Sequence, residues 1–243
     1  MSKLADRIRK ATRMSPQPLG FGSSKSASEP TMVLAAIARD AASAAGLADR
    51  GADVVIIGTG SAPAGAAKPA GGAITGAWIA GRADNESASY REAGFDFVVF
   101  SADAAATSLL DEDVGYVIAL PEDLTDNDLR TLEAFQLDAV DVGAIDGPMT
   151  VRRQIGLRRI YATTRKPLMA TVSPAITSTE LQALRDTNVI IVVVEGAENV
   201  ERLRTAIDGL PPRHRRKDGD DRPTPLVPRT VGAEEHDHED DGE

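Results

Sequence analysis

The side chains that most often carry catalysis are unevenly distributed along this chain of 243 residues. It contains no cysteine, and its three histidines, His214, His236 and His238, all lie after residue 210. A Ser-His-Asp triad, a Cys-His dyad and a metal site built from cysteines or several histidines are therefore excluded from residues 1–210. Any catalysis there must use Asp, Glu, Lys, Arg, Tyr, Ser or Thr, or a cofactor.

One carboxylate stands out when four similar segments of the chain are aligned. Each segment opens with a polar residue, namely Asp53, Asp96, Asp138 or Asn188, and continues as a short run of β-branched, aromatic or small apolar residues. The third position after the opening residue is Ile56, Val99 and Ile191 in three of the segments and Asp141 in the fourth. An unpaired buried charge is unfavourable, so Asp141 must be paired, protonated or bound to a ligand.

Two interpretations of Asp141 remain open. It is either a structural residue, hydrogen-bonded to backbone or to an arginine, or a functional one that acts as a general base or anchors a ligand. We name it as the candidate catalytic residue. The opening aspartates belong to the other end of the segments, where they are expected to serve stability.

The four runs have the length and composition of buried parallel strands, and side chains alternate along a strand. Positions two and four after the opening residue are uniformly large and are expected to pack on helices. Positions one, three and five are expected to point into a barrel. The outward set is Val55, Ile57, Val98, Phe100, Val140, Val142, Ile190 and Val192.

Eight strand–helix units follow one another along the chain. Strands are predicted at residues 19–22, 53–57, 74–80, 95–101, 115–120, 139–143, 167–172 and 189–194. Helices are predicted over 28–45, 83–93, 104–110, 126–135, 149–163, 177–186 and 198–207. This alternation requires a parallel sheet and favours an α/β fold, a (β/α)8 TIM-like barrel, over an open doubly wound sheet. A short helix over 2–14 precedes it, giving an N-terminal helix (1–15), a barrel (16–210) and a disordered charged tail (211–243).

Residues 167–178 and 189–197 resemble the closing units of phosphate-binding TIM barrels, which include phosphosugar isomerases, synthases and FMN-dependent enzymes. Ser173 follows the seventh strand and Gly196 follows the eighth, as in those families. The resemblance implies that backbone N–H groups there, with a helix N-terminus, hold a phosphate group and that FMN is one candidate cofactor. The chain departs from the pattern where Pro174 and Ala175 replace a glycine pair and where Glu195 adds a negative charge.

Other polar residues at predicted strand ends complete the expected ligand site. The full set of ligand-binding candidates is Lys25, Lys68, Arg82, Ser101, Ser173, Glu195 and Gly196. The three cations are expected to hold an anion. Residues 54–65 also resemble a dinucleotide-binding fingerprint, but Pro63 occupies the place of its third glycine, so a loop over the barrel mouth is favoured.

Charge and hydropathy exclude several further classes of function. The net charge of −10 argues against nucleic acid binding, and no apolar run is long enough to span a membrane. A charged first segment and the absence of cysteine favour a cytoplasmic protein. The tail after residue 210 changes from basic to acidic and is either a solvated segment or a docking element for a protein partner. A homo-oligomer is also left open.

Two hypotheses of function follow. In the first, the chain is a TIM-barrel enzyme that acts on or uses a phosphate-bearing small molecule, either a phosphorylated metabolite or FMN. In the second, it is a catalytically silent barrel that acts as a scaffold through its surface and its charged tail. The sequence alone leaves open whether the protein is an enzyme.

Overall fold

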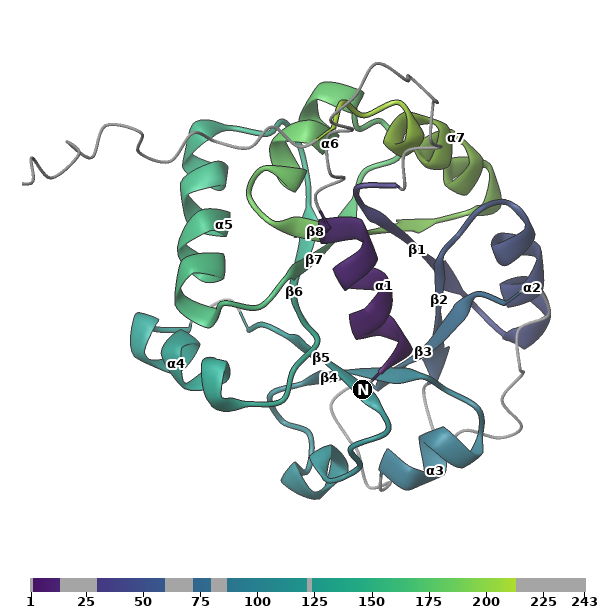
Figure 1. Cartoon of the computed structure of the whole chain (residues 1–243), viewed down its shortest axis with the longest axis vertical. Helices are drawn as coiled ribbons and strands as arrows, with labels where there is room; N and C mark the ends of the chain where they lie inside the picture. The colour runs from purple at the N-terminus through teal and green to yellow at the C-terminus, as the bar shows by residue number, and fades with distance from the viewer. Residues whose placement is uncertain (1, 14–29, 60–71, 80–86, 122–123, 213–243) are drawn as a thin grey trace, which may run out of the picture. The chain divides into compact units, whose positions relative to one another are not determined.

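Eight parallel strands close into a barrel in the order of the chain, from β1 to β8 (Figure 1). The computed structural model describes residues 2–13, 30–59, 72–79, 87–121 and 124–212. The predicted tail lies outside the described residues except for residues 211 and 212, and the predicted strand at 19–22 and the segment 60–71 with Lys68 lie outside them as well. Within the described part of the chain, no helix has the length and apolarity needed to cross a membrane.

The strands are β1 (Val33–Ala38), β2 (Val54–Thr59), β3 (Ile74–Ile79), β4 (Phe97–Ser101), β5 (Gly115–Ala119), β6 (Ala139–Ile145), β7 (Leu168–Val172) and β8 (Val189–Glu195). The α-helices are α1 (Lys3–Thr12), α2 (Ala41–Asp49), α3 (Ser87–Glu92), α4 (Asp126–Thr131), α5 (Val151–Thr164), α6 (Ser178–Arg185) and α7 (Ala197–Asp208). Two short 3₁₀ segments, η1 (Ala106–Leu109) and η2 (Leu132–Ala134), complete the set. The (β/α)8 fold class and the N-terminal helix are therefore confirmed.

The predicted helix over residues 28–45 is wrong. Its middle part is β1, which pairs with β2 on one side and β8 on the other, and only its end belongs to α2. The segment is rich in alanine, which favours helix, but β1 is buried on both faces and therefore shows no alternation of polar and apolar residues. Asp40 marks the true boundary, because its carboxylate accepts a hydrogen bond from the backbone N–H of Ser43 and caps α2.

The buried apolar residues form two separate clusters, one inside the barrel and one between the barrel and its helices. The expected alternation holds in β2, β4 and β6, where Ile56, Val99 and Ala139 pack inside and Val55, Val98 and Val140 pack outside. It fails at the start of β8. A register shift between β7 and β8 reverses Val189 and Ile190, so that Ile190 points inward together with Ile191.

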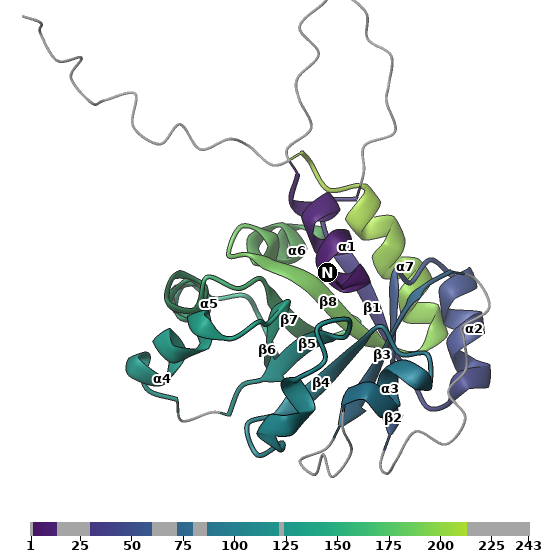
Figure 2. The same ribbon diagram turned by 60° about the horizontal axis from the view of Figure 1, so that its bottom comes forward.

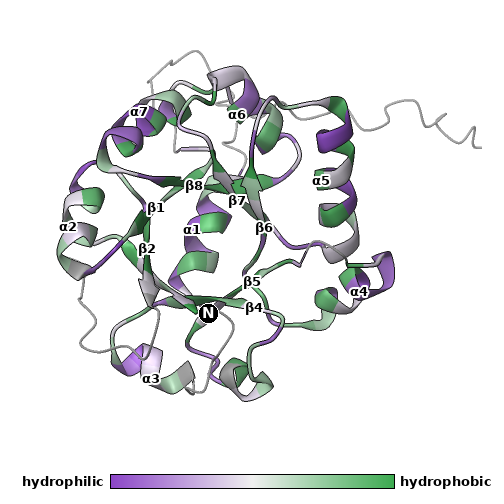
Figure 3. Cartoon of the chain, turned by 180° about the vertical axis from the view of Figure 1, so that it is seen from behind, coloured by the Kyte–Doolittle hydropathy of each residue, from purple (hydrophilic) through white to green (hydrophobic). Residues whose placement is uncertain are grey.

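Helix α1 closes the amino-terminal end of the barrel. It lies across the ring of strands in Figure 1, and its apolar part is seen inside the ring from the opposite side in Figure 3. Leu4, Ile8 and Ala11 are buried on one face of the helix and belong to the cluster inside the barrel. Figure 2 shows that the strands run away from α1, so the carboxyl ends of the strands lie at the other end of the barrel.

The three opening aspartates hold α1 in place. Lys3 Nζ lies 2.7 Å from Asp96 Oδ1, and Arg7 Nη2 donates to Asp53 Oδ1 over 2.8 Å. The hydroxyl of Ser2 donates to Asp138 Oδ2. Each carboxylate precedes a strand, so the same residue type at the start of β2, β4 and β6 makes three anchors for one helix.

We predict that Gly115→Ala destabilises the protein through displacement of α1. A Cβ at residue 115 would overlap the Asp138 carboxylate and press against Ser2 and Phe97. Overpacking of this kind lowers the free energy of unfolding by about 1–3 kcal/mol. Chemical denaturation measures this change.

Gly46→Ala is the matched control, since nothing lies near the added methyl group and Gly46 belongs to α2. It should leave stability unchanged or raise it by up to ~1 kcal/mol, because alanine has the higher helix propensity. Equal losses in the two variants would contradict the proposed seating of α1.

Candidate functional site

The inward side chains of alternate strands form layers across the barrel, as the strand register requires. The layer nearest the carboxyl ends from odd-numbered strands is Ile37, Trp78, Ala119 and Thr171. The layer directly below it, from even-numbered strands, is Ile56, Val99, Asp141 and Val193. Asp141 is therefore the one carboxylate in a layer that is otherwise aliphatic.

Burial of Asp141 is nearly complete, with an exposed fraction of 2%. Its backbone neighbours across the sheet are Ala119 on β5 and Met169 on β7, and Met169 belongs to the cluster inside the barrel. The Oδ1 atom accepts a hydrogen bond from the backbone N–H of Gly143 over 3.0 Å. No arginine or lysine of the described residues forms an ion pair with this carboxylate.

This environment changes the acidity of Asp141. Desolvation by the surrounding apolar side chains raises its pKa from 3.8 to about 6, and the hydrogen bond from Gly143 opposes that rise. A carboxyl group with such a pKa exchanges protons readily near neutral pH. The contrast with Asp53 is informative, because Asp53 accepts from Arg7, from Arg204 and from the backbone N–H of Leu34.

Small residues separate Asp141 from the carboxyl end of the barrel. Ala119 and Thr171, which flank it in the layer above, are only half-buried. Gly143 lies two residues further along β6, has a φ of 75°, and leaves open space where a Cβ would be. Among the described residues, the inward side chains between Asp141 and the carboxyl end on the β5–β7 side are therefore small.

A pocket of about 600 Å³ lies at the carboxyl ends of β1 and β8. Arg39 follows β1 and contributes to its wall, as do Glu195 and Gly196 at the end of β8. Gly196 is the N-cap of α7, with a φ of 88° and no side chain to satisfy the first backbone N–H groups of that helix. Arg39 forms no ion pair within the described part of the chain, whereas Arg50 at the same pocket pairs with Glu201.

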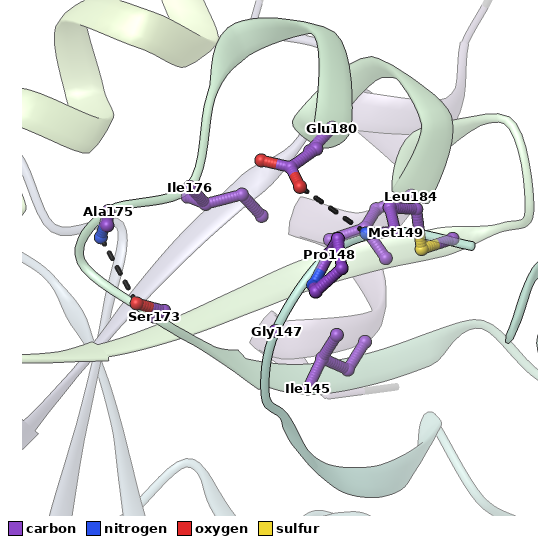
Figure 4. A pocket seen from close by; sticks show the side chains of 9 residues that line it. All are labelled: Ile145, Gly147, Pro148, Met149, Ser173, Ala175, Ile176, Glu180 and Leu184. Carbon is purple, nitrogen blue, oxygen red and sulfur yellow. Dashed lines mark hydrogen bonds between the residues drawn. The ribbon is translucent and has the colours of Figure 1, made fainter.

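A second pocket, of about 240 Å³, lies between the ends of β6 and β7 (Figure 4). Ser173 lines it, but the Ser173 hydroxyl already accepts from the backbone N–H of Ala175 over 3.2 Å. Glu180 also lines it and accepts from the backbone N–H groups of Met149 and Thr177. The start of α6 is thus capped by its own side chains, so its N–H groups are less available to a ligand than those of α7.

The residues expected to bind a ligand are only partly brought together. Ser173 and Gly196 line two different pockets, and Ser101 is half-buried at the end of β4. Lys25, Lys68 and Arg82 lie outside the described residues. In the described ranges, no cluster of three or more acidic or histidine side chains has a geometry that could hold a metal ion.

Sequence reasoning missed two residues at this end of the barrel, Arg39 and Trp78. Arg39 was assigned to a predicted helix, so its place after a strand was hidden. Trp78 lies in β3, which has no polar opening residue and was not part of the alignment. Trp78 lies four residues after Ile74 in a short apolar run, so the alternation of side chains along a strand gives both residues the same direction, which is inward in the structure.

Comparison with solved structures confirms the resemblance to TIM-barrel proteins. Tryptophan synthase from M. tuberculosis has a TM-score of 0.57 at 12% identity, covering 86% of this chain and 97% of that chain. 3-Keto-L-gulonate-6-phosphate decarboxylase from Vibrio cholerae O1 biovar El Tor has a TM-score of 0.54 at 17% identity, covering 74% and 99%. Thiamine phosphate pyrophosphorylase from Pyrococcus furiosus has a TM-score of 0.51 at 13% identity, covering 74% and 96%.

At such low identities these similarities show the fold alone. No protein-family model matches the chain, and no curated protein matches its sequence.

We predict that Asp141→Asn stabilises the protein at neutral pH. The folded state binds the Asp141 proton more tightly than the unfolded state, so its contribution to stability falls as the pH rises from about 4 to about 6. Above that range the ionised carboxylate costs about 3 kcal/mol, which asparagine removes while it keeps an acceptor for Gly143. The difference in unfolding free energy between the two proteins, measured from pH 4 to 8, should grow from near zero to ~1–3 kcal/mol.

Asp103→Asn, at an exposed position after β4, is the matched control and should show no such growth. Burial also raises the pKa of Asp138, but that group titrates in all three proteins and cancels from the differences. A stability loss in Asp141→Asn at every pH would favour the structural interpretation of Asp141.

Proposed function

We propose that this chain is a TIM-barrel enzyme that acts on a phosphate-bearing small molecule and uses Asp141 to transfer a proton. The observation that carries the proposal is the burial of this carboxylate in an aliphatic layer with one backbone hydrogen bond and no ion pair to a described residue. Perturbed ionisable groups of this kind concentrate at functional sites.

The same observation favours an enzyme over a catalytically silent scaffold. A barrel that serves only as a scaffold would be more stable with an aliphatic residue at position 141, like Ile56, Val99 and Val193 in the same layer. With its pKa raised to about 6, we expect the ionised carboxylate to lower stability at neutral pH by about 3 kcal/mol instead. A docking role for residues 211–243 and a cytoplasmic location stay predictions.

Asp141 suits general acid–base chemistry. A pKa of about 6 makes both protonation states accessible near neutral pH, so the group can accept a proton from a substrate and return it. Its Oδ1 is oriented by Gly143, while Oδ2 has no hydrogen-bond partner among the described residues. Oδ2 is therefore the atom that we assign to proton transfer.

The pocket at β1 and β8 supplies the support for a phosphate anchor. Backbone N–H groups at the start of α7, together with the positive end of the helix dipole, favour an anion. Arg39 adds a guanidinium that can bind two phosphate oxygens. Glu195 lies at the same pocket, and its negative charge opposes anions. We therefore assign the phosphate anchor to the part of the pocket formed by Arg39 and the Gly196 backbone, away from the Glu195 carboxylate.

FMN is one phosphate-bearing molecule that the sequence resemblance implies. The resemblance expects backbone N–H groups after β7 to bind its phosphate, and the residues there do not supply them. Pro174 has no N–H to donate, and the Ser173 hydroxyl is used by Ala175. We therefore derive no step of the mechanism from a flavin. An absorbance spectrum of the purified protein tests this directly, since bound FMN absorbs visible light.

We predict that inorganic phosphate and ribose 5-phosphate raise the melting temperature of the wild-type protein through the β1 and β8 pocket. A ligand that binds only the folded state at a hundredfold excess over its Kd adds ~3 kcal/mol of stability. Arg39→Ala should lose most of this shift, because the guanidinium is removed. Arg158→Ala, at an exposed position on α5, is the matched control and should keep it.

A wild-type protein that carries no flavin and gains no thermal stability from phosphate or from ribose 5-phosphate would refute the proposal. Loss of the shift in Arg158→Ala but not in Arg39→Ala would place the phosphate site elsewhere.

A further inference from the structure

Trp78 is the only tryptophan of the chain, and it lies at the carboxyl end of the barrel interior. It packs partly against the apolar cluster inside the barrel but stays partly exposed. Its backbone neighbours are Gly58 on β2 and Val99 on β4. A bulky, flat and largely apolar side chain therefore lies at the carboxyl end of the barrel interior, with part of its surface accessible.

The described residues beside Trp78 in the barrel interior are small. On β2, Gly58 has no side chain, and no atom lies within 4 Å of the place where its Cβ would stand. On the next strand, Ser101 is the last inward residue of β4. Within the layer of Trp78 itself, Ala119 and Thr171 are much smaller. Among the described residues of this layer, the indole is thus the largest side chain.

The layer of Trp78 lies directly above the layer of Asp141. The interior of an eight-stranded barrel holds about four side chains per layer, so it is narrow. Any group that approaches the Asp141 carboxylate from the carboxyl end must therefore pass Trp78 at close range. Two of the other three members of that layer are too small to fill the passage.

We propose that Trp78 stacks on a planar, conjugated ring of the phosphorylated substrate and holds it above Asp141. Aromatic rings in contact gain affinity beyond the burial of their area, which a saturated ring or an open chain does not. This inference rests on the proposed function, and it adds a substrate class: a phosphate ester that carries an aromatic or heteroaromatic ring.

The test uses three phosphate esters of increasing ring character: glycerol 3-phosphate, ribose 5-phosphate and phenyl phosphate. Because the chain has one tryptophan, its fluorescence reports on Trp78 alone. Phenyl phosphate should quench or shift the emission in a saturable way, and inorganic phosphate should not. Calorimetry should show that phenyl phosphate binds the wild-type protein several-fold more tightly than the other two esters.

Two variants separate stacking from general packing. Trp78→Phe keeps an aromatic face and should bind phenyl phosphate within about threefold of wild type, whereas Trp78→Leu should bind it about tenfold more weakly. Both variants should bind ribose 5-phosphate with nearly wild-type affinity. Melting temperatures establish that each variant folds, and the fluorescence titration of the unchanged protein stands even if a variant does not fold.

Each alternative outcome is decisive. Equal affinity for phenyl phosphate and ribose 5-phosphate, with no change of emission, would overturn the role of Trp78 and leave the proposed function intact. Failure of all three esters and of inorganic phosphate to bind would overturn both. A parallel loss of affinity for every ester in Trp78→Leu would assign Trp78 to packing.

Discussion

The interior of the closed barrel must be filled from within and sealed at one end, and the other features of the molecule follow from this constraint. Helix α1 provides the seal, with Leu4, Ile8 and Ala11 buried against the inward side chains of the strands. The aspartates that open β2, β4 and β6 fix the helix through charge and hydrogen bonds. An apolar interior results, and this interior is what makes the carboxylate of Asp141 so unusual.

Aspartates occur at the amino-terminal end of the barrel and in its interior, and the groups that they contact distinguish their roles. Asp53 accepts from two arginines and one backbone N–H group, which offsets the loss of hydration. Asp141 accepts from one backbone N–H group only, and desolvation by its apolar surroundings raises its pKa despite that hydrogen bond. The carboxylates at the amino-terminal end anchor α1, although burial raises the pKa of Asp138 as well. Asp141 has no such anchoring partner among the described residues, and we expect its ionised form to lower stability at neutral pH. In TIM barrels generally, residues at the amino-terminal end of the strands serve stability, and residues at the carboxyl ends carry function.

Seven of the eight strands could be predicted. In β2, β4, β6 and β8 the opening aspartate or asparagine marks where the strand begins and so which side chains share a face. In β3, β5 and β7 a short apolar run between helical segments was sufficient. Alternation then identified Asp141 as inward-facing, and the structure confirms this burial. β1 was lost because Ala35, Ala36 and Ala38 serve equally well in a helix and in a strand buried on both faces. The reversed start of β8 depends on its pairing with β7, a long-range contact that no local pattern encodes. The same limit hid Arg39 and Trp78, whose directions follow from strand register rather than from residue type.

The most direct test of this account is the ionisation of Asp141 in the folded wild-type protein. A titration of the side-chain carboxyl ¹³C resonance, assigned by comparison with Asp141→Asn, gives its pKa without perturbing the site. We expect a pKa of about 6 in the free protein and a shift of the titration when phenyl phosphate is added. A pKa at the ordinary value of 3.8, unchanged by phosphate esters, would show that Asp141 is solvated or paired and would contradict its role in proton transfer.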